Sequence, residues 1–412
     1  MTIHGQRSAI FISDFPFTSR DELRFGLSIF IARGYNPIIL NVAKVFPPTG
    51  AGGLDGDLST FPTQNVSSSS ELRSLLRDTS SGDLVINVVG LQRGHFHRYR
   101  ELHQLLSDSR GMLGGLDAAP VMPPERPRQH SFSLAARGVE VGRSARSWLI
   151  SLAAVRSFFR IIYGIRSLDF VWVATSAENV SPLFIGRKTR LIAIHSLDFD
   201  QLLVPRVAQK ESGPRLVLVD DLGPDHPDLQ ESEGAARGSS SSQEYFAELR
   251  LNLDQIELLA GCSVEVAAHP RARPGALEER YNYRRIHYGE TVRLIEQSSL
   301  VLLTGASTVV GIAVALKKPM MMIQLDGLND TRKARRNALV DFLHLVVFPD
   351  QCREAKWTWP SVKASAYGEY MERFVKSASS PRDNFWQAVI DFVEEKGTAG
   401  LSKHAETESS QQ

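Results

Sequence analysis

Two short segments in the second half of the chain carry residues that could hold a phosphate group. In the first, His269 and Pro270 close the apolar run 263-SVEVAAH-269, and Arg271 follows them. An imidazole can donate a hydrogen bond to a phosphate oxygen or place a positive charge beside it. The proline favours an extended conformation for the histidine before it. A core histidine followed by an ordinary proline turn is the alternative.

The second segment, 304-TGASTVVG-311, has the pattern of a strand end, a turn and a helix start. Gly305 permits a tight turn, and Ser307 or Thr308 is expected at the first turn of the helix. Free backbone N–H groups and the positive end of the helix dipole favour an anion at such a place. The alternative is an ordinary serine or threonine N-cap, which stabilises a helix by about 1 kcal/mol.

Carboxylates follow another predicted strand in 219-VDDLGPDHPD-228. Asp220 or Asp221 could take a proton from a hydroxyl group as a general base. Neighbouring strand residues point in opposite directions, so only one of the two is expected to face the site. Asp221 is the preferred candidate. Aspartate is also common in turns for purely structural reasons.

A second acidic pair, Asp198 and Asp200, lies in 195-HSLDFD-200. Two aspartates separated by one residue suit a divalent cation that prefers oxygen ligands. Such pairs also arise often by chance, so we predict no metal site here.

The N-terminal segment 13-SDFPFTSRDELRFG-26 could contribute from the other half of the chain. Asp14, Arg20 and Arg24 are expected to face the site from this half of the chain, although they could equally be solvated charges of a capped amphipathic helix. Gly26 would disfavour a helix by about 1 kcal/mol relative to alanine. That cost indicates close packing or a ligand at this position.

Alternating strand and helix patterns must position these residues. Apolar runs predict strands at 8–13, 36–42, 83–89, 169–175 and 190–196, and the pattern restarts with strands at 215–220, 263–269, 284–288, 300–304 and 319–324. Helices are expected at 20–34, 70–78, 96–108, 144–163, 244–259, 290–299, 306–317 and 381–395. Strands that alternate with helices indicate parallel sheets. The fold class is therefore α/β, with two Rossmann-like domains that face each other across a cleft.

The restart near residue 210 sets the domain boundaries. We expect an N-terminal domain over 1–207, a C-terminal domain over 208–380, a closing helix over 381–396 and a disordered tail over 397–412. The length of 412 residues suits two domains.

The composition excludes several classes of protein. A formal net charge of +1 gives no reason to expect nucleic acid as a partner, and two cysteines are too few for a disulfide scaffold. No signal peptide is recognisable, and arginines interrupt the longest apolar stretch, 147–164, so we expect a cytoplasmic protein. The Arg-rich region 137–166, which includes Trp148, could lie on a membrane surface, with core packing beneath a solvated basic face as the alternative.

Several of these motifs occur together in a known family. The order DFPF, HSLDFD, VDDLGPDHPD, AAHPR, HYGETVRLIEQSSLVL and STVVGIAVALKKP resembles a family encoded in bacterial capsule and O-antigen gene clusters. The second half is also similar to bacterial sialyltransferases, polysialyltransferases and Kdo transferases, which have two Rossmann-like domains and need no metal. That resemblance implies that His269 and Pro270 bind the nucleotide phosphate, that Ser307 and Thr308 form the Ser/Thr motif, and that Asp220 or Asp221 is the general base. Here Leu222 separates the acidic pair from Gly223.

The resemblance implies a GT-B-like glycosyltransferase that moves a sugar from a nucleotide-activated donor to a surface polysaccharide. The N-terminal domain is then expected to be the acceptor domain, with Asp14, Arg20 and Arg24 as acceptor-binding residues, and the C-terminal domain to be the donor domain. We predict Asp221, Asp220 and His269 as catalytic residues, no cofactor, a glycan or lipid-linked acceptor, and peripheral contact with the inner membrane. Two alternatives stay open at this point. The chain could be a nucleotide-sugar 2-epimerase-like enzyme, or a non-catalytic partner in polysaccharide assembly.

Overall fold

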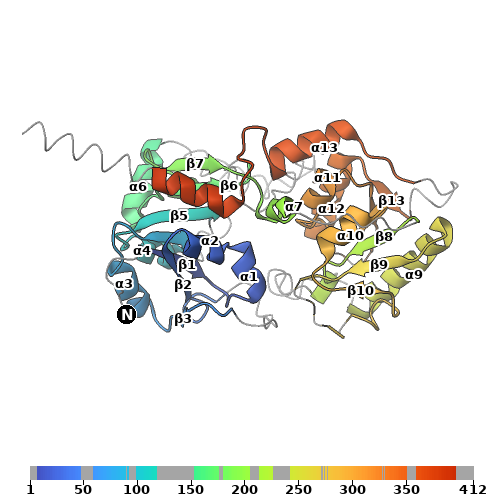
Figure 1. Ribbon diagram of the computed structural model, residues 1–412, viewed down its shortest axis with the longest axis horizontal. Coiled ribbons are helices and arrows are strands. Elements are labelled where there is room, and N and C mark those ends of the chain that lie inside the picture. Colours follow the sequence, from blue (N-terminus) through green and yellow to red (C-terminus); the bar gives the residue numbers. More distant parts are fainter. Residues whose placement is uncertain are drawn as a thin grey trace, which may run out of the picture.

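A computed structural model of the protein describes residues 7–47, 59–89, 91, 99–117, 153–175, 180–204, 213–225, 242–270, 272, 274–275, 277–326, 328, 330–349 and 359–395. They form two lobes that lie side by side (Figure 1). One lobe is built on a seven-stranded sheet and the other on a six-stranded sheet. Every strand pairing between described residues is parallel. The predicted fold class, α/β with two Rossmann-like domains, is confirmed.

The N-terminal sheet has the strand order β3-β2-β1-β4-β5-β6-β7. Its central strands are nearly continuous apolar runs, as expected for parallel strands that are covered on both faces. The sheet consists of β1 (Arg7–Ser13), β2 (Tyr35–Asn41), β3 (Thr63–Asn65), β4 (Leu84–Asn87), β5 (Met112–Asp117), β6 (Phe170–Val173) and β7 (Arg190–Ala193).

Helices cover both faces of this sheet. On one face, α3 (Ser69–Arg77), α4 (Arg100–Leu106) and α6 (Ala153–Tyr163) pack against a core that includes Ile12 and Val85. On the other face, α2 (Leu27–Ala32), with α1 (Ser19–Arg24) leading into it, and the helix over residues 385–395 enclose an aromatic core around Phe11 and Trp172.

The C-terminal sheet has the order β10-β9-β8-β11-β12-β13. It consists of β8 (Leu216–Val219), β9 (Val264–Ala267), β10 (Ile286–His287), β11 (Leu300–Leu303), β12 (Met320–Ile323) and β13 (Val346–Phe348). The helix α9 (Ser242–Ala260) packs on one core of this lobe. A second core lies beneath α10 (Thr291–Gln297), α11 (Val310–Ala315), α12 (Asp330–Leu343), α13 (Ala364–Tyr370) and the π-helical turn η5 (Met371–Val375).

The last described helix returns to the first lobe. Residues 385–395, red in Figure 1, lie against the N-terminal sheet although the chain has just left the C-terminal lobe. Trp386 is fully buried there, and its indole N–H donates to the Arg24 carbonyl at 2.8 Å. Gly26 adopts φ +58°, and a Cβ at this position would lie 2.7 Å from the Trp386 ring. Close packing against Trp386 therefore accounts for Gly26.

The joint between the lobes uses the 195–200 segment. Ser196 N–H donates to the Val375 carbonyl at 2.7 Å, and Phe385 N–H donates to Asp200 Oδ1 at 2.8 Å. His195 is fully buried, with its Nε2 3.4 Å from the same carboxylate oxygen. These bonds join the segment after β7 to Val375, at the end of the C-terminal lobe, and to Phe385, at the start of the last described helix.

Several predicted boundaries differ from the structure. The helix expected over 20–34 is two helices, because Gly26 adopts a left-handed conformation between α1 and α2. The helix expected over 306–317 begins later, at Val310. The elements that were not expected include β3, β5, β13, α12 and α13. Residues 118–152, 226–241 and 396–412 lie outside the described residues, so the predicted tail and most of the Arg-rich region are not tested.

Within the described residues, no helix combines the length and the apolar character that a membrane span requires.

Candidate functional site

The C-terminal sheet has a topological switch point between β8 and β11. These two strands are neighbours, but β9 and β10 extend the sheet to one side and β12 and β13 to the other. In open parallel sheets, ligands bind beyond the carboxyl ends of the strands at such a point. The residues there are Asp220 and Asp221 after β8, Thr304 and Gly305 after β11, and His269 after β9.

Asp220 ties the ends of two strands together. Its side chain is buried, with a residue exposure of 3%, and its oxygens accept from Leu222 N–H at 2.9 Å, His269 N–H at 3.1 Å and Tyr281 Oη at 2.7 Å. Burial raises the pKa of Asp220, although the three donors oppose that shift. With three donors already bound, this carboxyl fixes the position of the His269 backbone.

Asp221 faces the switch point itself. Its Oδ2 lies 3.2 Å from the guanidinium of Arg332 on α12, and its Oδ1 accepts from Gly223 N–H at 3.0 Å. A Cβ on Gly305 would lie 2.6 Å from Asp221 Oδ2. Only glycine therefore leaves room for the carboxylate, which places the β8 loop directly against the β11 loop.

The turn after Asp221 is unusual in its backbone. Leu222 and Gly223 both adopt left-handed conformations, with φ +58° and +51°. A buried leucine in this region is strained, and strain of this kind concentrates at functional sites. A Cβ on Gly223 would lie 2.4 Å from the buried ring of Tyr245. The hydroxyl of Tyr245 is 3.4 Å from Asp221 Oδ1. Burial, followed by the Asp221 charge, raises the pKa of Tyr245 well above its usual value.

His269 and Pro270 follow the end of β9, as the sequence indicated, with Ala268 between the strand and the histidine. His269 is half-buried and Pro270 is exposed, and the His269 carbonyl accepts from Ala272 N–H at 2.8 Å. Arg271 lies outside the described residues. β9 and β11 flank β8, so the histidine and the Gly305 turn lie on either side of the Asp220–Asp221 pair.

The turn between β11 and α11 differs from the prediction. α11 begins at Val310 with Val309 as its N-cap, so neither Ser307 nor Thr308 caps the helix. Ser307 Oγ instead accepts from Val309 N–H at 3.3 Å, and the Val310 and Gly311 N–H groups bond to the Ser307 and Thr308 carbonyls. These tight turns ahead of the helix delay its start.

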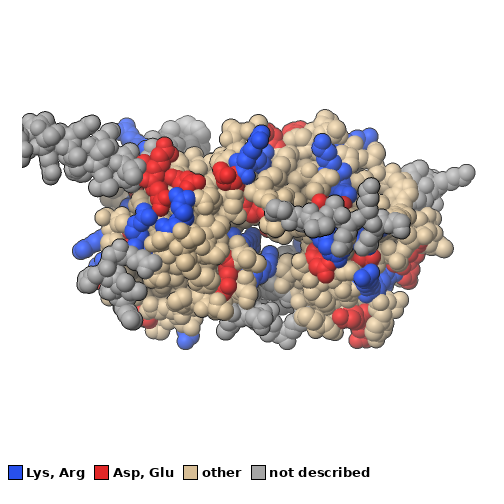
Figure 2. All heavy atoms as spheres, viewed as in Figure 1, with Lys and Arg blue, Asp and Glu red and all other residues tan. Residues whose placement is uncertain are grey.

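Asp14, Arg20 and Arg24, which were expected to bind an acceptor, differ from one another in burial and in their contacts. Asp14 Oδ2 accepts from Tyr99 Oη at 2.6 Å. Arg20 is exposed on α1 and Arg24 is half-buried at its end. Figure 1 places α1 beside the gap between the lobes, and Figure 2 shows the surface hollowed there, with basic side chains at the hollow.

The D-x-D pair belongs to the lobe joint. Asp198 is buried, and Asp200 receives the Phe385 N–H described above. Burial raises the pKa of Asp200. No group of three or more His, Cys, Asp or Glu side chains suited to a metal ion occurs among the described residues.

Sequence reasoning missed two residues of this site, Arg332 and Tyr245. Both come from helices whose amino-terminal parts lie near the switch point, and neither belongs to a recognisable motif. The basic run 332-RKARR-336 directly after 326-DGLND-330 is the one local signal that could have drawn attention to Arg332.

Comparisons with known proteins give only distant likenesses. No family model matches the chain, and no curated protein matches it. Among solved structures, the calicheamicin glycosyltransferase CalG4 is similar at 13% identity, covering 98% of each chain with a TM-score of 0.43. MurG from Acinetobacter baumannii is similar at 10% identity, covering 94% of this chain and 99% of its own, with a TM-score of 0.43. The spinosyn rhamnosyltransferase SpnG, solved with thymidine diphosphate, is similar at 12% identity, covering 89% of this chain and 90% of its own, with a TM-score of 0.41.

Proposed function

We propose that this protein is a glycosyltransferase that moves a sugar from a nucleotide-activated donor to a glycan acceptor. The observation that carries the proposal is the switch point of the C-terminal sheet. There, Asp220 bonds to the His269 backbone and Asp221 occupies the space that Gly305 leaves open. The sequence indicated these residues separately, and their convergence at a ligand-binding edge supports a shared ligand.

In this proposal the donor phosphates bind near His269, Pro270, Arg271 and the 305–308 turn. The guanidinium of Arg332, 3.2 Å from Asp221 Oδ2, adds a cation of fixed position at the same edge. Positive groups held beside the leaving phosphate stabilise the charge that develops on it during transfer. Transfer by this route needs no metal ion.

The acceptor would lie across the hollow, against Asp14, Arg20 and Arg24 of the N-terminal lobe. Closure of the lobes would exclude water that otherwise hydrolyses the donor. For the proton transfer the sequence nominates Asp221, and this stays a prediction. A base in that position must first release the Arg332 guanidinium, because the ion pair occupies Oδ2.

The acceptor class and the location belong to the same proposal. We propose a surface-polysaccharide acceptor, transfer in the cytoplasm and peripheral contact with the inner membrane. Support for the membrane contact comes from α6, where Phe158, Ile161 and Ile162 are 59%, 80% and 56% exposed. Apolar side chains at this helical spacing, accompanied by basic residues, are typical of helices that lie on a lipid surface.

Thermal stability in the presence of CMP-, UDP-, GDP- and dTDP-sugars tests the donor site. A ligand at one hundred times its Kd stabilises the folded protein by about 2.7 kcal/mol, so one nucleotide class should raise the melting temperature clearly. His269→Ala leaves the backbone bond to Asp220 intact and should weaken that donor about tenfold, as expected for loss of a charged hydrogen bond. Glu279→Gln, an exposed side chain of the same lobe, serves as the control. If no nucleotide-sugar stabilises the wild type, the donor site as described is wrong.

A further inference from the structure

Two buried polar groups at the carboxyl edge of the N-terminal sheet have an atom without a hydrogen-bond partner. Asn87 ends β4 with an exposure of 0%, and Asp117 ends β5 with an exposure of 6%. Within the described part of the chain, Asn87 Nδ2 and Asp117 Oδ2 are buried and unbonded. A buried polar atom left unpaired costs about 1–3 kcal/mol. Two such atoms close together suggest a place that a ligand completes.

The register puts both side chains on one face of the sheet. Asn87 pairs with Gly115 on β5, and Asp117 is two residues further along the same strand. Successive strand residues alternate between faces, so Asp117 shares the face of Gly115, whose missing side chain would meet Leu91. Asn87 shares the face of Val85, which belongs to the same core as Leu91. The amide and the carboxyl are therefore diagonal neighbours.

Strand β1 adds a third polar group at the same edge. Ile12 pairs with Asn87 across the switch point of this sheet, and Asp14 follows the end of β1. The Asp14 carboxylate accepts from the Tyr99 hydroxyl at 2.6 Å. Asp14 and Tyr99 are therefore titratable groups of the described residues that lie at the same edge of the sheet as Asp117. Three adjacent strands, β1, β4 and β5, thus end in polar side chains where a ligand is expected.

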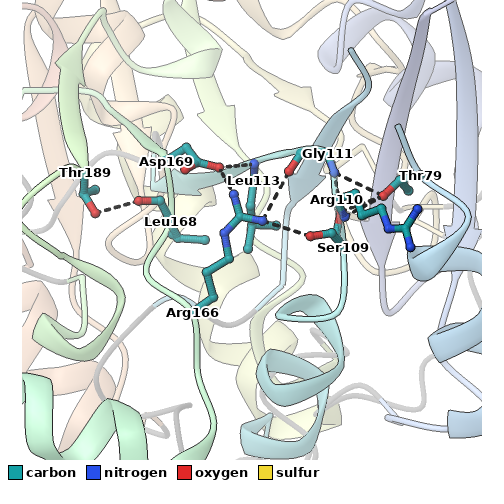
Figure 3. A network of polar contacts seen from close by, with 9 residues as sticks. All are labelled: Thr79, Ser109, Arg110, Gly111, Leu113, Arg166, Leu168, Asp169 and Thr189. Carbon is teal, nitrogen blue, oxygen red and sulfur yellow. Dashed lines mark hydrogen bonds and ion pairs between the residues drawn. The ribbon is translucent and has the colours of Figure 1, made fainter. Parts of the chain in front are cut away.

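The opposite edge of the same strands shows that this lobe can satisfy its polar groups. Figure 3 shows a continuous network there, in which Asp169 Oδ2 accepts from Leu113 N–H at 2.8 Å and from Arg166 at 2.6 Å. Thr79 Oγ1 accepts from the Arg110 and Gly111 N–H groups at 2.9 and 3.1 Å (Figure 3). The polar groups drawn there are bonded to one another, whereas Asn87 Nδ2 and Asp117 Oδ2 at the carboxyl edge are unbonded within the described residues.

We propose that Asp117 accepts the proton of the acceptor hydroxyl and that the Asn87 amide donates to the same hydroxyl oxygen and orients it. The role rests on the proposed function. In the step, the acceptor O–H bond breaks and its proton passes to Asp117 Oδ2. The acceptor oxygen forms a bond to the anomeric carbon, the bond from that carbon to the phosphate oxygen breaks, and the nucleotide leaves with the electron pair.

The environment of Asp117 suits this role. Burial raises the pKa of Asp117 to about 6. At pH 7.5 the carboxyl is therefore mostly ionised, and it is a stronger base than an ordinary aspartate. A general base contributes about 10²–10⁴-fold to a rate when its pKa lies near the working pH. By contrast with Asp221, no cation among the described residues is bonded to Asp117 Oδ2 and would have to leave before it accepts a proton.

Release of nucleotide into water, the simplest acceptor, tests the role with the nucleotide-sugar that stabilises the wild type most. We expect Asp117→Asn to lower kcat at least 100-fold while the thermal shift by the donor is retained. Asp108→Asn changes an exposed surface ion pair of the same lobe and should leave kcat unchanged. An Asp117→Asn protein that releases nucleotide within threefold of the wild-type rate overturns the role.

A second variant keeps the test decisive if Asp117→Asn does not fold. Asn87→Asp places a second carboxyl beside Asp117, and like charges disfavour ionisation of both. The low-pH limb of the kcat profile should move from about pH 6 to a higher pH, whereas an unmoved limb overturns the role. A wild type that no nucleotide-sugar stabilises, or one that binds donor without releasing nucleotide, overturns the proposed function instead.

Discussion

The carboxyl edges of the two sheets present aspartates in opposite states. In the C-terminal lobe, Asp221 is bonded to Arg332 and to the Gly223 backbone and lies against Gly305. In the N-terminal lobe, Asp117 is more deeply buried, and its Oδ2 has no partner within the described residues. An aspartate at the carboxyl edge of a sheet is therefore a structural bracket in one lobe and the proposed reactive group in the other.

Under the proposed function, the two lobes divide the work of the transfer reaction between them. A paired carboxylate holds two loops and an arginine in fixed positions, which is what a phosphate site requires. An unpaired buried carboxyl makes the folded state less stable and gains basicity in return. Replacing Asp117 and replacing Asp221 should therefore change the free energy of unfolding in opposite directions.

The largest effect on stability is expected from Asp117. Its pKa rises from 3.8 to about 6 on folding, so the folded state binds more protons than the unfolded state between these values. Stability contributed by this group is then lost as the pH rises through that window. At 1.36 kcal/mol per pKa unit, Asp117→Asn should be more stable than the wild type by up to about 3 kcal/mol at pH 8 and nearly equal to it at pH 4. Thermal unfolding of both proteins at pH 4 and pH 8 measures this difference in stability. If Asp117→Asn is less stable than the wild type at pH 8, the contrast between Asp117 and Asp221 does not hold.

The next effect is a loss of stability at Asp221. Asp221→Asn removes the charge that pairs with Arg332, and both side chains are 15% exposed. A charged hydrogen bond in a mostly buried place contributes about 1.5–3 kcal/mol, so we expect a loss of about 2 kcal/mol and weaker donor binding. The pH profile of kcat tells the two aspartates apart. If the low-pH limb disappears in Asp221→Asn and persists in Asp117→Asn, the base is Asp221, as the sequence indicated.

The sequence predicted ten of the strands, because parallel strands covered on both faces are short apolar runs. It could not predict β5, since Gly114 and Gly115 interrupt the run 112-MLGGLD-117. The structure gives the reason for these glycines: a Cβ on Gly114 would lie 2.1 Å from the Trp172 ring, and one on Gly115 would lie 2.6 Å from Leu91. Contacts with residues that are distant in the sequence therefore require glycine at both positions. Asp117 was missed together with the strand that positions it.

The candidate site was predictable in part for a similar reason. Residues directly after strands, such as Asp220, Asp221, His269 and Gly305, could be located from the strand pattern alone. Arg332 could not, because its place beside Asp221 depends on how α12 packs against the sheet. The ion pair of Asp221 could not be predicted either, because the sequence of a Gly/Pro turn does not show whether its aspartate has a cationic partner.

The smallest effect, and the most specific one for the C-terminal site, is the coupling between Gly305 and Asp221. Gly305→Ala would place a Cβ 2.6 Å from Asp221 Oδ2, and overpacking of this kind costs about 1–3 kcal/mol. In an Asp221→Ala background the carboxylate is gone, so the added methyl group should cost at least about 1 kcal/mol less. A double-mutant cycle on unfolding free energies measures that coupling. Additive effects would mean that the two loops do not touch in solution, and the description of Asp221 as a bracket would then fail while that of Asp117 would stand.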